Sequence, residues 1–332
     1  MAKFLITGGA GFIGSNIAEF LTKQGHSVRV LDNFCSGKEE NIAFAKGLGK
    51  DKFELIRGDI RESAVAEKAC EGVDAIMHQA ALRSVPKSME DPESYNDVNI
   101  NGILNMLKAA AKKKVKRFVF ASSSSVYGDT DQFPEKEEHY PLLISPYALS
   151  KLAGEYYCRI FSTHFGVETV CLRYFNVFGP KQALDDEYAV VVPKFIHCIL
   201  HDEPPPIFGT GKQSRDFTYI ENVVSANFLG ATTPGIKHEV VNVGNGKSQT
   251  VLYLVQALNK IIGKNIQPKL LPIRAGDVFK TEADIAKITN VLKYKPSVSF
   301  EEGLKRTVDY FKDVYSKSEA KTRNKKLVKQ VR

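Results

Sequence analysis

The chain has 332 residues, a formal net charge of +8 and a hydrophobic content of 43%, which allows a large core and two closely packed lobes. No apolar run approaches the ~20 residues of a membrane span, and the first residues enter a strand-like segment directly, which argues against a secretion signal. Five scattered cysteines without a Cys-x-x-Cys pair argue against a disulfide framework or a metal site and favour a cytoplasmic location.

Short apolar runs alternate with helical patterns over the first half of the chain. The runs predict strands at residues 3–7, 27–31, 53–56, 75–78, 117–121 and 169–173. The helical patterns cover residues 12–24, 62–70, 92–113 and 146–165. Such alternation implies right-handed crossovers, so we expect a Rossmann-type, doubly wound parallel sheet of the α/β class over residues 1–175.

Proline and glycine break this pattern from about residue 176 onward. Helices are predicted at 222–231, 251–262 and 300–315, with short strands such as 239–242 between them, which indicates a smaller α+β lobe over residues 176–315. Residues 316–332 hold seven Lys or Arg against one Glu, a net +6, and have no aromatic side chains. We expect this basic tail to be disordered or a frayed helix and expect no nucleic acid partner.

A glycine-rich turn follows the first strand and opens the first helix. Its sequence is Thr7-Gly-Gly-Ala-Gly11-Phe-Ile-Gly14, with glycines at 8, 11 and 14. The first permits a tight turn, the second lets the backbone approach a pyrophosphate, and the third lets helix and strand pack closely. The N–H groups at the helix start then face an anion. The context predicts a dinucleotide site.

Polar residues end the next strands at the same edge of the sheet. Asp32 follows Gly14 by 18 residues, where a carboxylate can accept hydrogen bonds from an adenosine ribose and would repel a 2′-phosphate, which favours NAD over NADP. Asp59 and Ile60 end the third strand, where an adenine edge can be read. His78-Gln-Ala-Ala81 ends the fourth with small residues, and we interpret His78 as structural.

Tyr147 and Lys151 share one face of the predicted helix 146–165, after the serine run 122–125. A free phenol has a pKa near 10 and is a poor base at neutral pH, but a nearby cation stabilises the phenolate. The pair therefore predicts a Tyr base assisted by Lys.

Further motifs strengthen a family resemblance. They are Asn99-Ile-Asn101-Gly, Ser-Ser-Val-Tyr127-Gly, Arg173-Tyr-Phe-Asn176-Val-Phe-Gly, Ser214-Arg-Asp-Phe217 and Arg274-Ala-Gly-Asp277. With the glycine loop and the Tyr–Lys pair, they make the chain resemble the extended short-chain dehydrogenase/reductase family, in its UDP-sugar 4-epimerase branch. The resemblance runs from Lys3 to about Tyr315.

The resemblance implies NAD contacts from many positions around the glycine loop and the strand ends. These are Gly8, Gly11, Phe12, Ile13, Gly14, Asp32, Asn33, Ser36, Gly37, Asp59, Ile60, Gln79, Ala80, Ala81, Arg83, Asn99, Ser122, Tyr147, Lys151 and Tyr174. It implies that a UDP-sugar is held by Ser84, Ser123, Ser124, Tyr147, Asn176, Val190, Lys194, Phe208, Arg215, Arg274, Asp277 and Thr281. In that set Asn176 and Arg215 hold the diphosphate, Arg274 and Asp277 hold phosphate and ribose, and Phe208 packs on the uracil.

The serine run separates this chain from sister enzymes. The dehydratases it resembles carry Thr-Asp-Glu before Val-Tyr-Gly, and the glucuronate decarboxylases carry Glu before that Val, whereas this chain has Ser123, Ser124 and Ser125. The resemblance therefore implies C4 epimerisation: Tyr147 removes the 4-hydroxyl proton, Ser123 hydrogen-bonds the same oxygen, and Lys151 lowers the Tyr147 pKa and holds the nicotinamide ribose. A 4-keto sugar then turns over and is reduced on its other face.

Substrate size rests on the position four residues after Asp277. A bulky Tyr there excludes N-acetyl groups in similar epimerases, so Thr281 predicts UDP-GlcNAc/UDP-GalNAc, with UDP-Glc/UDP-Gal as further substrates. Arg83 departs from the glycine found in some N-acetyl-accepting members. With Lys87 it leaves a UDP-uronic acid 4-epimerase as an alternative, and a non-catalytic NAD-binding regulator is the alternative from another class. The resemblance also implies a homodimer through helices 92–113 and 146–165.

Overall fold

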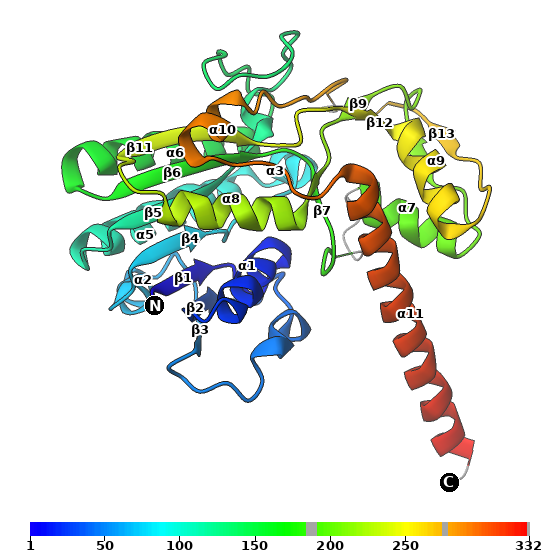
Figure 1. The fold of residues 1–332 in the computed structure, drawn as a ribbon, viewed down its shortest axis with the longest axis horizontal. Helices are drawn as coiled ribbons and strands as arrows, with labels where there is room; N and C mark the ends of the chain where they lie inside the picture. The colour runs from blue at the N-terminus through cyan, green and yellow to red at the C-terminus, as the bar shows by residue number, and fades with distance from the viewer. Residues whose placement is uncertain (184–190, 274–277, 331–332) are drawn as a thin grey trace.

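The computed structural model describes residues 1–183, 191–273 and 278–330, with side chains described as far as Lys317. A seven-stranded, wholly parallel sheet with the order β11-β6-β5-β4-β1-β2-β3 forms its centre (Figure 1). The strands are β1 (Lys3–Thr7), β2 (Ser27–Asp32), β3 (Phe53–Arg57), β4 (Ala75–His78), β5 (Arg117–Ser123), β6 (Glu168–Tyr174) and β11 (His238–Val243). The predicted doubly wound α/β fold is confirmed.

Helices cover both faces of this sheet and bury alternate residues of each strand. Phe4 and Ile6 of β1 pack into one core with α1 (Phe12–Lys23) and α8 (Ile220–Thr232). Leu5 packs into the opposite core with α2 (Ser63–Cys70), α5 (Gly102–Lys112) and α6 (Pro146–Phe165). Because both faces are buried, the strands read as apolar runs rather than as alternating polar and apolar residues.

The predicted helix 92–113 is interrupted. It consists of α4 (Pro92–Asn96), a π-helical turn over Asp97–Asn101 and then α5. The short helix α3 (Val85–Glu90), which the sequence did not predict, precedes it. A π turn adds a residue to the helical repeat and changes which side chains point inward. Here it coincides with the burial of Asn99, which is 4% exposed.

The chain after residue 176 contributes to two parts of the molecule. The predicted strand at 239–242 lies in β11, which pairs with β6 at the edge of the central sheet, so its expected place in the smaller lobe is wrong. The smaller lobe contains α7 (Val191–Leu200), α9 (Val251–Ile262) and three two-stranded pairs, whereas α10 (Ala286–Leu292) packs against β11 and α8. The pairs join β7 (Val177–Phe178) to β10 (Thr218–Tyr219), β9 (Ser214–Arg215) to β12 (Gln249–Thr250), and β8 (Pro206–Phe208) to β13 (Lys269–Leu271).

The last helix, α11 (Phe300–Gln330), begins in the core and leaves it. Phe300, Leu304, Val308 and Phe311 are buried, and the helix then continues away from the body (Figure 1). None of the helices in the described part of the chain has both the length and the apolar character needed to cross a bilayer.

Candidate active site

A cavity of about 580 Å³ opens at the carboxyl ends of the central strands. Open parallel sheets bind ligands at this edge, where the strand order reverses. Predicted site residues that line the cavity are Gly8, Gly11, Phe12, Ile13, Gly14, Asp32, Asn33, Ser36, Asp59, Ile60, Gln79, Ala80, Ala81, Arg83, Ser84, Ser122, Ser123, Ser124, Tyr147, Lys151, Tyr174 and Asn176. The fold therefore brings the glycine loop, the serine run and the Tyr–Lys pair to one place.

The glycine loop is built without room for side chains. A Cβ at Gly8, whose φ is +66°, would lie 2.8 Å from the Ala80 nitrogen, and one at Gly14 would lie 2.2 Å from the Gly8 oxygen. Helix α1 starts next to the loop, and its N-cap, Gly11, offers no side-chain acceptor to the first N–H groups. Those donors and the helix dipole suit a pyrophosphate, so the residues present fit a dinucleotide.

Two carboxylates stand at the far ends of β2 and β3. Asp32 accepts hydrogen bonds from the backbone N–H groups of Ala10 and Phe34, both at 2.8 Å. Gly37 lies behind it, outside the cavity lining, where a Cβ would approach Asp32 Oδ1 to 2.8 Å. The Arg61 guanidinium hydrogen-bonds both oxygens of Asp59 and, as the main cause, lowers the pKa of this carboxyl to about 2. Asp32 is thus fixed in place by backbone donors, and Asp59 is held charged by Arg61, at the adenosine end of the predicted site.

Tyr147 and Lys151 lie on the first turns of α6. Ser145 caps this helix by accepting from the Ala148 N–H at 3.1 Å, and Pro146 occupies its first position. The Lys151 ammonium donates to the Ala121 carbonyl at 2.8 Å and stands 5.7 Å from the centre of the Tyr147 ring. Burial lowers the pKa of Lys151 to about 7. A proton therefore leaves this amine near neutral pH.

Burial also raises the pKa of the Tyr147 phenol. A hydrogen bond with the Ser123 hydroxyl and the positive charge of Arg83 oppose that shift. The backbone on both sides of Arg83 is fixed, because Leu82 exchanges hydrogen bonds with the Asn99 side chain at 2.8 and 2.9 Å and the Ser84 N–H donates to the Tyr95 hydroxyl at 3.0 Å. Asn99 itself is outside the cavity lining, so in this structure it supports the loop that carries Arg83.

Two serines of the run, Ser122 and Ser123, make different contacts at the end of β5. Ser123 accepts from the Ser125 N–H at 3.1 Å and caps the short turn that follows. Ser122 donates to Glu155 at 2.5 Å, and the Arg173 guanidinium holds the same carboxylate at 2.8–2.9 Å. Glu155 and Arg173 are both 5% exposed at the side chain. No role was predicted for Glu155 from the sequence, although its spacing of four residues from Lys151 places it on the same helix face.

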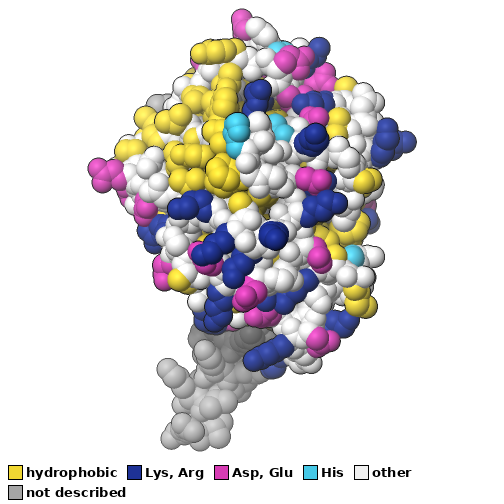
Figure 2. Space-filling model, turned by 90° about the vertical axis from the view of Figure 1, so that its left-hand side faces the viewer, with side chains coloured by type: hydrophobic (Ala, Val, Ile, Leu, Met, Phe, Trp, Pro, Cys, Tyr) yellow, Lys and Arg dark blue, Asp and Glu magenta, His cyan; other side chains and the backbone are white. Residues whose placement is uncertain are grey.

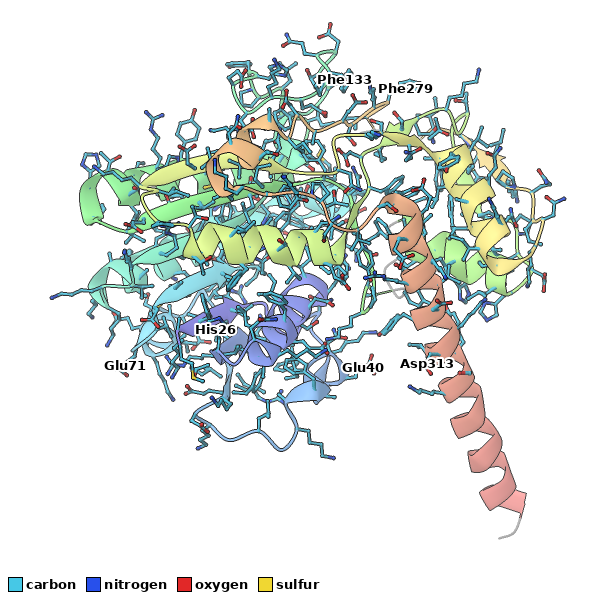
Figure 3. The ribbon with its side chains drawn as sticks, viewed as in Figure 1. His26, Glu40, Glu71, Phe133, Phe279 and Asp313 are labelled. Atoms are coloured by element: carbon cyan, nitrogen blue, oxygen red, sulfur yellow. The ribbon has the colours of Figure 1, made fainter. Side chains whose placement is uncertain are left out.

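Fewer of the residues predicted to bind the UDP-sugar than of those predicted to bind NAD line the cavity. Asn176 lines the cavity and donates to the Thr281 hydroxyl at 2.9 Å, so Thr281 lies behind Asn176 and is 7% exposed. Arg215 donates to the carbonyls of Ser214 and Phe279 at 2.9 and 3.2 Å. Phe279 and Phe133 are labelled in Figure 3, and the Phe133 ring lies 4.9 Å from the Lys280 ammonium.

Other predicted sugar contacts stand outside the cavity lining or outside the described chain. Phe208 lies in β8 and Lys194 in α7. Val190, Arg274 and Asp277 lie outside the described residues.

Several cavity-lining residues were missed by the sequence reasoning. They include Lys38, Asn41, Arg61, Lys181 and Gln182. The signal for the last two was the Gly179-Pro180 turn after Asn176, which brings the chain back toward α1. The turn itself can be predicted from Gly179 and Pro180, but its direction toward α1 depends on the packing of the two lobes.

The chain matches the model of the NAD dependent epimerase/dehydratase family over residues 4–244. The chain belongs to this family. It is 37% identical over 311 residues to a putative UDP-glucose 4-epimerase of Methanocaldococcus jannaschii, a match that covers 93% of this chain and 98% of that one. The family assignment, the enzymatic nature and the NAD dependence predicted from the sequence are confirmed.

Solved structures of the epimerase/dehydratase family superimpose on this fold. A UDP-N-acetylglucosamine 4-epimerase from Methanobrevibacter ruminantium, in complex with UDP-N-acetylmuramic acid, has a TM-score of 0.89 and 39% identity and covers 94% of this chain and 98% of its own. A UDP-glucuronic acid 4-epimerase variant from Bacillus cereus, in complex with NAD and a fluorinated UDP-glucuronic acid, has a TM-score of 0.87 and 34% identity and covers 94% and 100%.

Proposed function

We propose that this enzyme inverts C4 of a UDP-hexose and that UDP-GlcNAc and UDP-GalNAc are its main substrates. The observation that carries the reaction class is the position of Ser123, Tyr147 and Lys151 in one cavity with the glycine loop. Among the described residues that line this cavity, the only carboxylates are Asp32 and Asp59, at the ends of β2 and β3. Elimination of water requires an additional acid and base near the sugar, so the lining supports epimerisation over dehydration.

Bound NAD supplies the acceptor and donor of the hydride at C4, and the protein supplies the proton chemistry. Tyr147 as phenolate takes the proton of the 4-hydroxyl, while the Ser123 hydroxyl hydrogen-bonds the same oxygen. Positive charge is required because burial disfavours the phenolate, and the Arg83 guanidinium provides it from the cavity wall. The glycine loop, Asp32 and Lys151 would hold the cofactor.

The contact between Asn176 and Thr281 supports the proposed sugar size. Thr281 is small, buried and hydrogen-bonded to a cavity-lining side chain. A tyrosine at 281 would push Asn176 toward the sugar and remove the acceptor that Asn176 uses. The space for an N-acetyl group would then shrink.

One observation favours a second candidate, a UDP-uronic acid 4-epimerase. Arg83 lines the cavity with Ser84 and Tyr147, so a cation stands near the predicted sugar position. A C6 carboxylate suits such a cation. The two candidates differ in whether activity depends on the charge at 83.

The test is an NMR assay of the purified holoenzyme with UDP-GlcNAc, UDP-Glc and UDP-GlcA, without added cofactor. We expect C4 inversion of UDP-GlcNAc, its loss in Thr281→Tyr, and retained turnover of UDP-Glc. Thr281→Val is the matched control, because it removes the hydroxyl without adding bulk. Turnover of UDP-GlcA alone, abolished by Arg83→Gln, would establish the uronic acid alternative instead. An unchanged preference in Thr281→Tyr would refute the role of Thr281.

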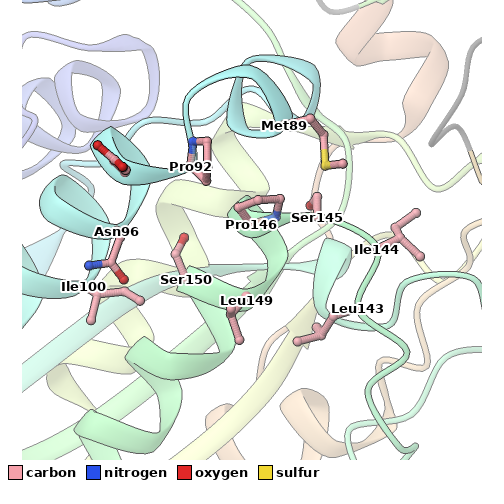
Figure 4. A pocket seen from close by; sticks show the side chains of 11 residues that line it. Met89, Pro92, Asn96, Ile100, Leu143, Ile144, Ser145, Pro146, Leu149 and Ser150 are labelled. Carbon is pink, nitrogen blue, oxygen red and sulfur yellow. The ribbon is translucent and has the colours of Figure 1, made fainter.

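We also propose a homodimer through the faces of α4, α5 and α6. On α6, Leu149, Tyr156 and Ile160 are 53%, 58% and 45% exposed, which is unusual for large apolar side chains on one helix. A groove of about 670 Å³ adjoins them, with Pro92, Asn96 and Ile100 on one side, Leu143 and Ile144 on the other, and Leu149 between (Figure 4).

Hydrophobic side chains gather in one area of the face drawn in Figure 2, whereas charged side chains of both signs are mixed over the rest of it. The occupant we infer for the α6 face is the same face of a second copy, related by a twofold axis. Light scattering after size-exclusion chromatography should give twice the monomer mass for the native protein and the monomer mass for Leu149→Glu. Equal masses for both proteins would contradict this interface.

A further inference from the structure

The turn after β7 crosses from the smaller lobe back to α1 and lies along the cavity. We call residues 179–182 the strap. The Pro180 carbonyl accepts from the Asn16 side chain at 3.2 Å. The Lys181 ammonium reaches Glu19 at 2.7 Å and the Asn41 carbonyl at 3.1 Å. One short segment is thus attached to both α1 and the 3₁₀ helix Glu39–Ala45.

These contacts close a ring of elements around the dinucleotide end of the cavity. Asn41 is itself bonded to the glycine loop, because its side-chain amide donates to the Ala10 carbonyl at 2.8 Å. Asn41, Lys181 and Gln182 line the cavity together with Gly11 and Gly14. A dinucleotide on the glycine loop would therefore lie against a wall to which the strap contributes.

The backbone of Lys181 indicates that its side chain holds the strap in place. Its φ is +69°, a left-handed conformation that is uncommon for a residue with a Cβ and is strained unless surrounding contacts favour it. Its side chain is 15% exposed, and the ammonium also stands 5.2 Å from the centre of the Phe44 ring. A partly buried ion pair of this kind is screened less by salt than a surface pair.

We propose that the strap is a clasp that retains the bound NAD through turnover and that Lys181 is the positioning residue that keeps it closed. The ion pair with Glu19 spans the two lobes, so its loss frees the strap without touching the Tyr147 centre. Retention suits a reaction without net oxidation, because the cofactor is regenerated in each cycle and does not need to exchange.

The chain provides a matched control on the same carboxylate. Lys23 also pairs with Glu19, at 2.7 Å, but it belongs to α1 itself, one turn away, and is 71% exposed. Lys181→Met removes the pair that joins the strap to α1, and Lys23→Met removes a pair within α1. Both substitutions remove one positive charge and leave Glu19 with one partner.

The experiment measures how fast NAD leaves the purified holoenzyme, by exchange against labelled NAD, and how much NAD copurifies per chain. We expect Lys181→Met to release NAD about tenfold faster, a change that corresponds to about 1.4 kcal/mol. Lys23→Met should stay within about twofold of the native protein, and Lys181→Arg should restore most of the retention. At saturating NAD, any fall of kcat in Lys181→Met should be much smaller than the gain in the rate of NAD release.

Native retention in Lys181→Met would overturn the proposal, and so would equally fast release from Lys23→Met. A fall of kcat at saturating NAD as large as the gain in release would also overturn it, because the residue would then act on the reacting centre. If Lys181→Met does not fold by circular dichroism, Glu19→Gln tests the same contact from the other side. The double variant should release NAD no faster than Lys181→Met alone, since the contact between Lys181 and Glu19 is already absent from Lys181→Met and the pair of Glu19 with Lys23 is exposed.

Discussion

Lys151 offers a test of the electrostatics of the site, because burial of its amine disfavours the charged form. Burial lowers its pKa from 10.5 to about 7, while the unfolded chain keeps the ordinary value. Between these two pH values the unfolded state binds more protons than the folded state, so stability rises with pH across this window. The free-energy cost of burying the charged amine is fully present below pH 7, and it is relieved as the pH approaches 10.5. At 1.36 kcal/mol per pH unit, it reaches about 5 kcal/mol at most.

Lys151→Met replaces the amine by an apolar side chain of similar length. In NAD-free protein we expect the variant to gain free energy of unfolding over the native chain at pH 7, and we expect this gain to shrink by several kcal/mol at pH 10. Urea unfolding at both pH values measures it, and tyrosines and cysteines that titrate in both proteins cancel in the difference. A difference between the two proteins that does not change with pH would refute the assigned burial of the charge.

Three further substitutions test neighbouring parts of the site. Tyr147→Phe should lower kcat by about 10²–10⁴ while NAD content and folding stay native, and near-full activity would remove Tyr147 from its role. Glu155→Gln should lower the free energy of unfolding by about 3–5 kcal/mol, because the buried Arg173 loses its ion partner; chemical denaturation measures this, and a loss below 1 kcal/mol would contradict it. Gly14→Ala should lower the free energy of unfolding by about 1–3 kcal/mol and weaken NAD retention, because the new methyl group would clash with the Gly8 carbonyl. An unchanged melting temperature and NAD content would contradict this and would show that the loop shifts to make room.

The pattern of apolar residues along the sequence predicted the strands and helices whose bounds depend on neighbouring residues. The apolar runs located β1 and β4 with their observed bounds, and helix α6 also begins and ends where its pattern predicted. Strand β5 runs two residues beyond its predicted end, to Ser123, because pairing with β6 continues as far as Ser123 opposite Tyr174. Hydrogen-bonding partners therefore decide where a strand ends.

Features that depend on distant partners were not accessible to the sequence. The π turn at Asp97–Asn101 accompanies the contacts of Asn99 with Leu82 and Ser150, and neither partner lies in its own helix. Glu155 reads as an ordinary helix-surface acid until β6 places Arg173 against it. Thr281 was predicted to touch the sugar, and the structure places it behind Asn176.

The position of β11 has a consequence for how the chain is made. Strand β6 is complete at Tyr174, but the neighbour that covers its outer edge arrives only with His238–Val243. A chain emerging from the ribosome therefore carries an unpaired, apolar sheet edge for more than sixty residues of synthesis. A fragment cut after β6 keeps this edge exposed permanently. We expect such a fragment to aggregate, although it contains the whole glycine loop and the Tyr–Lys pair.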